Sequence, residues 1–128
     1  MTSYRTPLAR ARGLGSAKHG VGHWISERVG AVALIPLVIW GAYSAIRLAQ
    51  LDYYGAVEWI GEPVNATLMV LTIAISFMHM QSGLRVVVED YIHKTLTKAA
   101  LLLLNVFVAG LAGALAIFSI LKVALGGA

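Results

Sequence analysis

The sequence contains no cysteine and few charged side chains, and both shortages limit what the protein can be. With 0 cysteines in 128 residues, disulfides, thiolate metal sites and cysteine-ligated iron–sulfur clusters are excluded within this chain. Only 12% of the residues are charged, 59% are hydrophobic, and the mean hydropathy is +0.77. These values lie outside the range of soluble globular domains. The composition therefore indicates an integral membrane protein, and the length allows one small domain.

The basic side chains are concentrated near the N-terminus. The net charge is +4, and half of the basic residues precede the first long apolar run: Arg5, Arg10, Arg12, Lys18 and Arg28. A basic flank beside a membrane span explains this surplus more simply than a nucleic-acid partner does. We therefore expect a basic N-terminal segment over 1–28, a transmembrane domain over 29–128, and no nucleic-acid partner.

Three apolar runs are long enough to cross a bilayer, which takes roughly 20 helical residues. They cover about 29–49, 64–88 and 99–123 and predict an all-α integral membrane fold of three transmembrane helices. Pro63 suits the first turn of the second helix. The third run also has small residues at a spacing that favours close helix packing: Ala109, Gly113 and Ala116.

The basic residues also predict the orientation. The connection between the second and third runs carries Lys94 and Lys98, whereas the first connection has no Lys or Arg beyond the helix-end Arg47. We expect that first connection to be an acidic loop with an aromatic belt. By the positive-inside rule, the N-terminus and the second connection face the cytoplasm or matrix. The Arg- and Ser-rich start also resembles a transit peptide, and Ala42 to Ala45 resemble a signal cleavage site. We disfavour both, because the segment before the first run is long for the n-region of a signal peptide and because part of it belongs to the family resemblance given below.

One histidine, His79, lies inside a predicted span, whereas His19, His23 and His93 lie in the N-terminal segment or the second connection. An ionisable side chain in hydrocarbon is costly unless something satisfies it, which makes His79 a functional candidate. Two interpretations are open. The imidazole is either neutral and bonded to a neighbouring helix, or an axial ligand of haem iron.

Residues after His79 share one face of the predicted helix. Gly83 lies one turn on, and Asp90 lies about 20° from the same meridian after three turns, roughly 16 Å along the axis. A glycine beside a histidine leaves room for a flat macrocycle, although it also suits a plain helix contact. Arg85 lies some 120° around from His79. It could reach a propionate or a partner helix, or snorkel to headgroups, and we favour snorkelling.

Taken together, these motifs resemble the small cytochrome b membrane-anchor subunit of succinate dehydrogenase, respiratory complex II. The resemblance rests on a histidine in the second of three spans, a glycine four residues on, and Asp-Tyr where the helix ends, over residues 75–93. The stretch "GLGSAKHGVGHWISERVGAVAL", residues 13–34, is similar to the start of that anchor in its α-proteobacterial and mitochondrial-type forms.

The resemblance implies a role for each matched residue. His79 corresponds to an axial ligand of haem b, with Gly83 giving the macrocycle clearance. Tyr91 corresponds to the phenol that hydrogen-bonds a ubiquinone carbonyl, and Asp90 to a neighbour that shapes the quinone site and its proton supply. Arg28 matches a basic position near the haem propionates and the quinone pocket. Without the resemblance, Tyr91 would be an ordinary interfacial aromatic and Arg28 an ordinary positive-inside residue.

The resemblance also implies a larger assembly. Because one histidine lies within a span and no cysteine is present, the second haem ligand and the iron–sulfur centres would come from other chains. We expect half of a heterodimeric helical bundle, paired with a second membrane-anchor subunit and docking an iron–sulfur subunit and a flavoprotein subunit. Such a complex passes electrons from succinate to ubiquinone, linking the tricarboxylic acid cycle to the respiratory chain. The expected location is the lipid of a bacterial inner membrane with a cytoplasmic N-terminus, ahead of a mitochondrial inner membrane.

Two other functions fit part of the sequence. A haem-free structural anchor or assembly subunit would use His79 only as a satisfied core histidine. A small transporter subunit would use His79, Arg85 and Asp90 as a proton relay. The transporter is disfavoured because the half of the second run that precedes His79 has no ionisable residue to complete a path across the membrane.

Overall fold

The computed structural model describes residues 4, 6–13 and 20–126, and the regular structure within them is entirely helical. Part of the N-terminal resemblance falls on 14–19, which lies outside the described residues. The all-α prediction is confirmed. The helices are α1 (Pro7–Ala11), α2 (Gly20–Leu48), α3 (Tyr53–Gly61), α4 (Pro63–Tyr91) and α5 (Thr95–Ala124).

Helices α2, α4 and α5 are long and apolar enough to cross a membrane, with 29, 29 and 30 residues. At about 1.5 Å per residue each is roughly 44 Å long, more than the roughly 30 Å of a hydrocarbon core. All three therefore extend beyond the apolar runs that predicted them. Arg28, at the end of the predicted basic segment, consequently lies inside α2, and Asp90 and Tyr91 lie inside α4.

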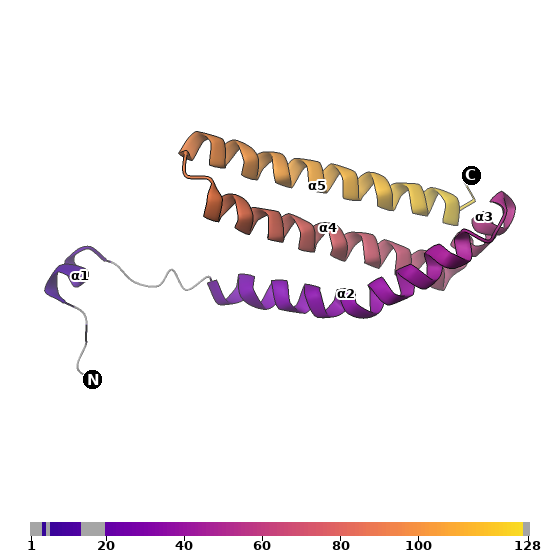
Figure 1. Cartoon of the computed structure of the whole chain (residues 1–128), viewed down its shortest axis with the longest axis horizontal. Helices are drawn as coiled ribbons and strands as arrows, with labels where there is room; N and C mark the ends of the chain where they lie inside the picture. Colours follow the sequence, from indigo (N-terminus) through magenta and orange to yellow (C-terminus); the bar gives the residue numbers. More distant parts are fainter. Residues whose placement is uncertain (1–3, 5, 14–19, 127–128) are drawn as a thin grey trace.

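Helix α4 is the central element, with α2 and α5 on its two sides (Figure 1). Residues 92–94 connect α4 to α5, so the two helices form a tight antiparallel hairpin. Pro63 occupies the first turn of α4, as expected. Proline also explains the shape of α2, because Pro36 cannot donate a backbone hydrogen bond inside the helix. Figure 1 shows α2 bending partway along its length.

The interface between α4 and α5 is closely packed. A Cβ added to Gly113 would lie 3.3 Å from the Phe77 ring, so the two helices approach where the side chain is absent. Asn105 Nδ2 on α5 donates to the Gln81 carbonyl on α4 at 2.8 Å. Ala109 and Gly113 are buried, as their small-residue spacing predicts. This interface combines small residues with a satisfied polar group.

The connection between α2 and α4 contains a helix where a loop was expected from the sequence. Asp52 caps α3, because its Oδ1 accepts from the Gly55 N–H at 2.9 Å. Trp59 of α3 stacks on Trp40 of α2, with ring centroids 6.0 Å apart and planes 19° apart. Asn65 Nδ2 donates to the Trp59 carbonyl at 2.9 Å. The acidic, aromatic segment is therefore folded against the end of the bundle, where α3 contacts α4 and α5.

Little of this molecule is enclosed by its own chain. The buried apolar residues are Leu37, Ala66, Ala109 and Ile120. Within the part of the chain that the structure describes, no large side chain is less than 2% exposed. Helices that are apolar on all sides and yet unburied are suited to lipid or to contact with other membrane helices.

Candidate functional site

His79 lies near the middle of α4, on the side that faces α2. Its Nδ1 atom is buried and has no hydrogen-bond partner among the described residues. A Cβ added to Gly30 of α2 would lie 3.8 Å from Nδ1, so α2 covers this nitrogen with a glycine. Because Nδ1 faces α2, Nε2 at the far end of the ring is the atom through which this imidazole can bind a metal or ligand.

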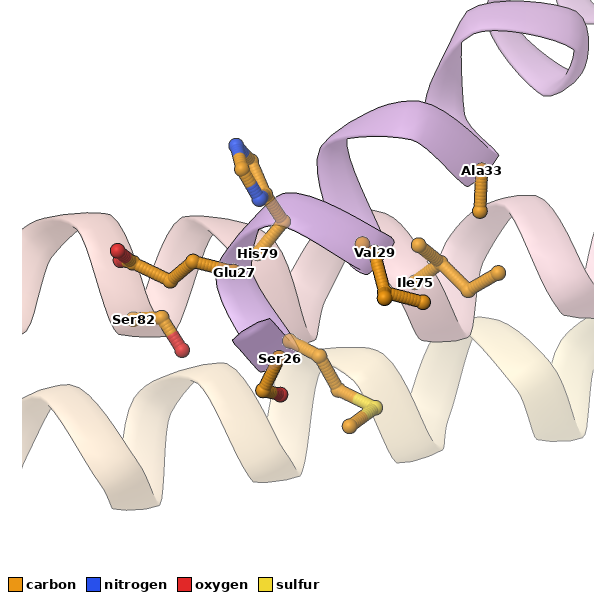
Figure 2. Close-up of a pocket in the computed structure, with 9 residues that line it drawn as sticks. Ser26, Glu27, Val29, Ala33, Ile75, His79 and Ser82 are labelled. Carbon is orange, nitrogen blue, oxygen red and sulfur yellow. The ribbon is translucent and has the colours of Figure 1, made fainter. Parts of the chain in front are cut away.

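A cavity of about 220 Å³ lies beside His79 between α2 and α4 (Figure 2). This volume is below the roughly 300–1,000 Å³ of pockets that enclose a ligand, so the cavity can hold only part of a large one. Its walls are mostly apolar, with a few polar side chains near the histidine. The lining residues are Ser26, Glu27, Val29, Gly30 and Ala33 from α2, and Ile75, Met78, His79 and Ser82 from α4.

The α2 wall of this cavity was not predicted from the sequence. Ser26, the half-buried Glu27 and Gly30 all line the cavity, yet Ser26 and Glu27 precede residue 29, where the apolar run was expected to begin. The available signal was the spacing of Ser26 and Gly30, which are four residues apart and therefore share one helix face. This spacing can be used only if the helix is taken to begin before residue 29, as α2 does at Gly20.

Asp90 and Tyr91 lie where α4 ends, and both are exposed. Tyr91 is 77% exposed, and the backbone becomes extended at Ile92, with φ −102° and ψ 111°. Tyr91 follows His79 by twelve residues, which is about 18 Å along a helix axis. The structure therefore separates the histidine from the carboxylate and the phenol, and gives α4 two distinct candidate sites.

Two bonds that were not predicted from the sequence hold the last turns of α4. Arg85 Nε donates to Glu89 Oε1 at 2.8 Å, forming an ion pair one helical turn apart. Lys98 Nζ of α5 donates to the backbone carbonyl of Glu89, also at 2.8 Å. A carbonyl in the last turn of a helix lacks a helical partner, and a lysine is a favourable one.

Arg28 and Gly83 lie outside the lining of the His79 cavity. The Arg28 guanidinium carbon lies 5.3 Å from the centroid of the Trp24 ring, within the range of a cation–π contact. A Cβ added to Gly83 would have no atom beyond its own helix backbone within 4 Å. The space beside Gly83 is thus open.

The described residues offer separate chemical groups and no metal cluster. No set of three or more His, Cys, Asp or Glu side chains that could hold a metal ion occurs within residues 4, 6–13 and 20–126. His79 can supply one donor to a metal that takes its other ligands elsewhere. Tyr91 can donate a hydrogen bond, and Asp90 can accept or release a proton.

Comparisons with known proteins agree with this architecture. Residues 2–117 match a family described as the succinate dehydrogenase/fumarate reductase transmembrane subunit. The chain is 32% identical over 90 residues to the succinate dehydrogenase hydrophobic membrane anchor subunit of Rickettsia conorii, covering 70% of this chain and 71% of that one. It is 31% identical over 104 residues to the same subunit of Paracoccus denitrificans, covering 81% of each. No solved structure gives a significant match. With its three long apolar helices, the chain belongs to the family of succinate dehydrogenase/fumarate reductase transmembrane subunits and is a membrane anchor of that kind.

Proposed function

We propose that this chain is one half of a two-chain membrane anchor that binds haem b and delivers electrons from succinate to ubiquinone. The complex, in a bacterial inner membrane, also contains the second anchor chain, an iron–sulfur subunit and a flavoprotein subunit. Segment 1–28 lies on the cytoplasmic side. The observation that carries the proposal is the layout of α4, which has an imidazole in its apolar middle and a carboxylate and a phenol at its exposed end.

The surroundings of His79 fit an axial haem ligand. Neutral imidazole is a common ligand of haem iron, and because the buried Nδ1 faces α2 at Gly30, Nε2 is left available. The open space at Gly83 gives a planar group access to the helix backbone. When bound, haem b supplies a one-electron redox centre. The small cavity and the single ligand agree with a site whose other half comes from the second anchor chain.

Arg28 has a supporting role in this proposal. Its guanidinium is exposed on α2 and stacks on Trp24, so it is held on the molecule while its N–H groups stay available. Carboxylates such as the haem propionates are natural partners of a guanidinium. Arg28 would therefore balance propionate charge at the boundary of the partner chain.

Ubiquinone would bind where α4 ends. The Tyr91 hydroxyl donates a hydrogen bond to a quinone carbonyl oxygen, which orients the ring and stabilises the negative charge that develops on reduction. Asp90, beside it, transfers protons from water to the reduced quinone. Both residues are exposed at the helix end, which gives the quinone access from lipid and the protons access from water.

The test is Tyr91→Phe in the assembled complex, because this change removes the donor and keeps the aromatic ring. Loss of such a hydrogen bond typically costs about 1–3 kcal/mol, so succinate:ubiquinone turnover should fall by roughly ten- to a hundredfold. Succinate oxidation with an artificial acceptor that takes electrons before the membrane anchor should stay the same. Normal ubiquinone turnover in Tyr91→Phe would refute the role of the phenol. A fall in both assays would indicate an assembly defect instead.

A further inference from the structure

We infer that Lys98 is a positioning residue for the quinone site. By binding the Glu89 carbonyl, Lys98 fixes the last turn of α4, the turn that presents Tyr91. This inference rests on the proposed function, since it takes the end of α4 as the place where the quinone binds. It adds a residue from α5 to the Asp90 and Tyr91 end of α4.

The backbone at the end of α4 leaves a carbonyl for Lys98 to bind. The last four carbonyls of an α-helix have no partner within the helix. The Ile92 N–H closes the final helical bond, donating to the Val88 carbonyl at 3.1 Å. At Ile92 the backbone then turns extended, so the next carbonyl, that of Glu89, receives no helical N–H. Lys98 Nζ binds this carbonyl at 2.8 Å.

Lys98 is well placed to make this bond. It lies in the first turn of α5, whose start is held by the Lys98 N–H donating to the Lys94 carbonyl at 2.8 Å. The side chain is half-buried and reaches back across the short connection to α4. A positive charge at the C-terminal end of a helix is favourable, and a bond from a charged donor is stronger than a neutral one. Lys98 thus clamps the end of one helix to the start of the next.

The other bond at this place is a weaker restraint. The ion pair of Arg85 and Glu89 joins side chains that are 49% and 41% exposed, and exposed pairs contribute little. It also holds the Glu89 carboxylate and not the backbone. Tyr91, two residues beyond Glu89, is 77% exposed, so packing within the chain does not fix its position. The direction of its side chain therefore depends on the helical geometry that Lys98 maintains.

The experiment compares Lys98→Met with Lys98→Arg and Lys94→Met in the assembled complex. Lys98→Met keeps an apolar stem and removes the donor, Lys98→Arg keeps a charged donor, and Lys94→Met removes a nearby charge that makes no side-chain cap bond. Steady-state kinetics use a soluble short-chain ubiquinone analogue. The kcat/KM of Lys98→Met for this analogue should fall roughly five- to tenfold, because a displaced Tyr91 weakens both quinone binding and the stabilisation of the charge that develops on reduction. Lys98→Arg should restore kcat/KM, and Lys94→Met should leave it unchanged.

Several outcomes would overturn the inference. An unchanged kcat/KM in Lys98→Met would do so, and so would an equal fall in Lys94→Met, which would indicate a general effect of charge. Loss of succinate oxidation with the artificial acceptor, or of the haem spectrum, would show that Lys98 serves assembly instead. Tyr91→Phe, measured in parallel, separates the two claims. If Tyr91→Phe is impaired and Lys98→Met is normal, only the inference fails, whereas normal quinone turnover in Tyr91→Phe removes the proposed site itself.

Discussion

Helix α4 meets its two neighbours in different ways. Toward α5 the contact is close, with Gly113 against Phe77 and a hydrogen bond from Asn105 to the Gln81 carbonyl. Toward α2 the helices leave a cavity of about 220 Å³, and the buried Nδ1 of His79 has no partner among the described residues. One face of α4 thus has its polar contact satisfied, and the other has a polar atom unsatisfied.

This difference separates an interface that is bonded and closely packed within the described chain from one that leaves a cavity and an unbonded polar atom. In a membrane, small residues and satisfied polar groups are what stabilise a helix pair. An unbonded polar atom in an apolar setting and a loosely packed space between helices both lower stability, so the pairing of α2 with α4 is the weaker of the two. The α4/α5 interface has the small residues and the satisfied polar group, whereas the α2/α4 interface has the unbonded atom and the cavity.

The largest expected effect is on the α2/α4 interface. His79→Leu should abolish the b-type signal in a reduced-minus-oxidised spectrum of the assembled complex, because it removes the proposed axial ligand. The complex should still assemble, since burying a leucine in hydrocarbon costs less free energy than burying an imidazole without a partner. Co-purification of the subunits provides the control. A full b-type spectrum in His79→Leu would refute the assignment of His79 as an axial haem ligand.

A second experiment makes the same substitution at both interfaces. At Gly113 an added methyl lies 3.3 Å from Phe77 Cγ, whereas at Gly30 it lies at an ordinary 3.8 Å from His79 Nδ1. Overpacking destabilises a fold by about 1–3 kcal/mol, whereas the higher helix propensity of alanine stabilises a helix by up to about 1 kcal/mol relative to glycine. Gly113→Ala should therefore lower the Tm of the complex, and Gly30→Ala should leave it unchanged or raise it. Equal losses at both positions would contradict the contrast between the interfaces.

The smallest expected effect concerns the hydrogen bond across the α4/α5 interface. Asn105→Leu removes the bond to the Gln81 carbonyl, and interhelical bonds in membranes average about 0.6 kcal/mol. A slight fall in Tm with an unchanged haem spectrum is expected. Ser119→Ala is the matched control, because the Ser119 hydroxyl bonds only to the Leu115 carbonyl of its own helix. If the two variants were equally stable, the bond would contribute nothing to the pairing of α4 and α5.

Features that depend on local composition could be predicted from the sequence. The apolar runs are enough to identify the three long helices, and Pro63 marks the start of α4. Small-residue spacing predicts the burial of Ala109 and Gly113. The position of His79 within a helix follows in the same way, because hydropathy and helical period are properties of the chain alone.

Features that depend on tertiary contact could not be predicted. Helix α3 is short and contains glycine, and its Trp59 stacks on Trp40 from a different helix. The bond from Lys98 to Glu89 depends on how the chain turns after α4. The α2 wall of the His79 cavity was missed because its residues precede the apolar run, although the helix includes them.

The short connection between α4 and α5 has a consequence for the order in which the bundle is built. Because residues 92–94 are all that separates the two helices, bringing them together costs little chain entropy. Helix α2 joins α4 through the longer segment that contains α3, and its final position includes the stacking of Trp40 on Trp59. We therefore expect the α4–α5 hairpin to pair first and α2 to dock later. Until α2 docks, the cavity beside His79 has no α2 wall, so a planar cofactor would have its widest approach in the half-built anchor.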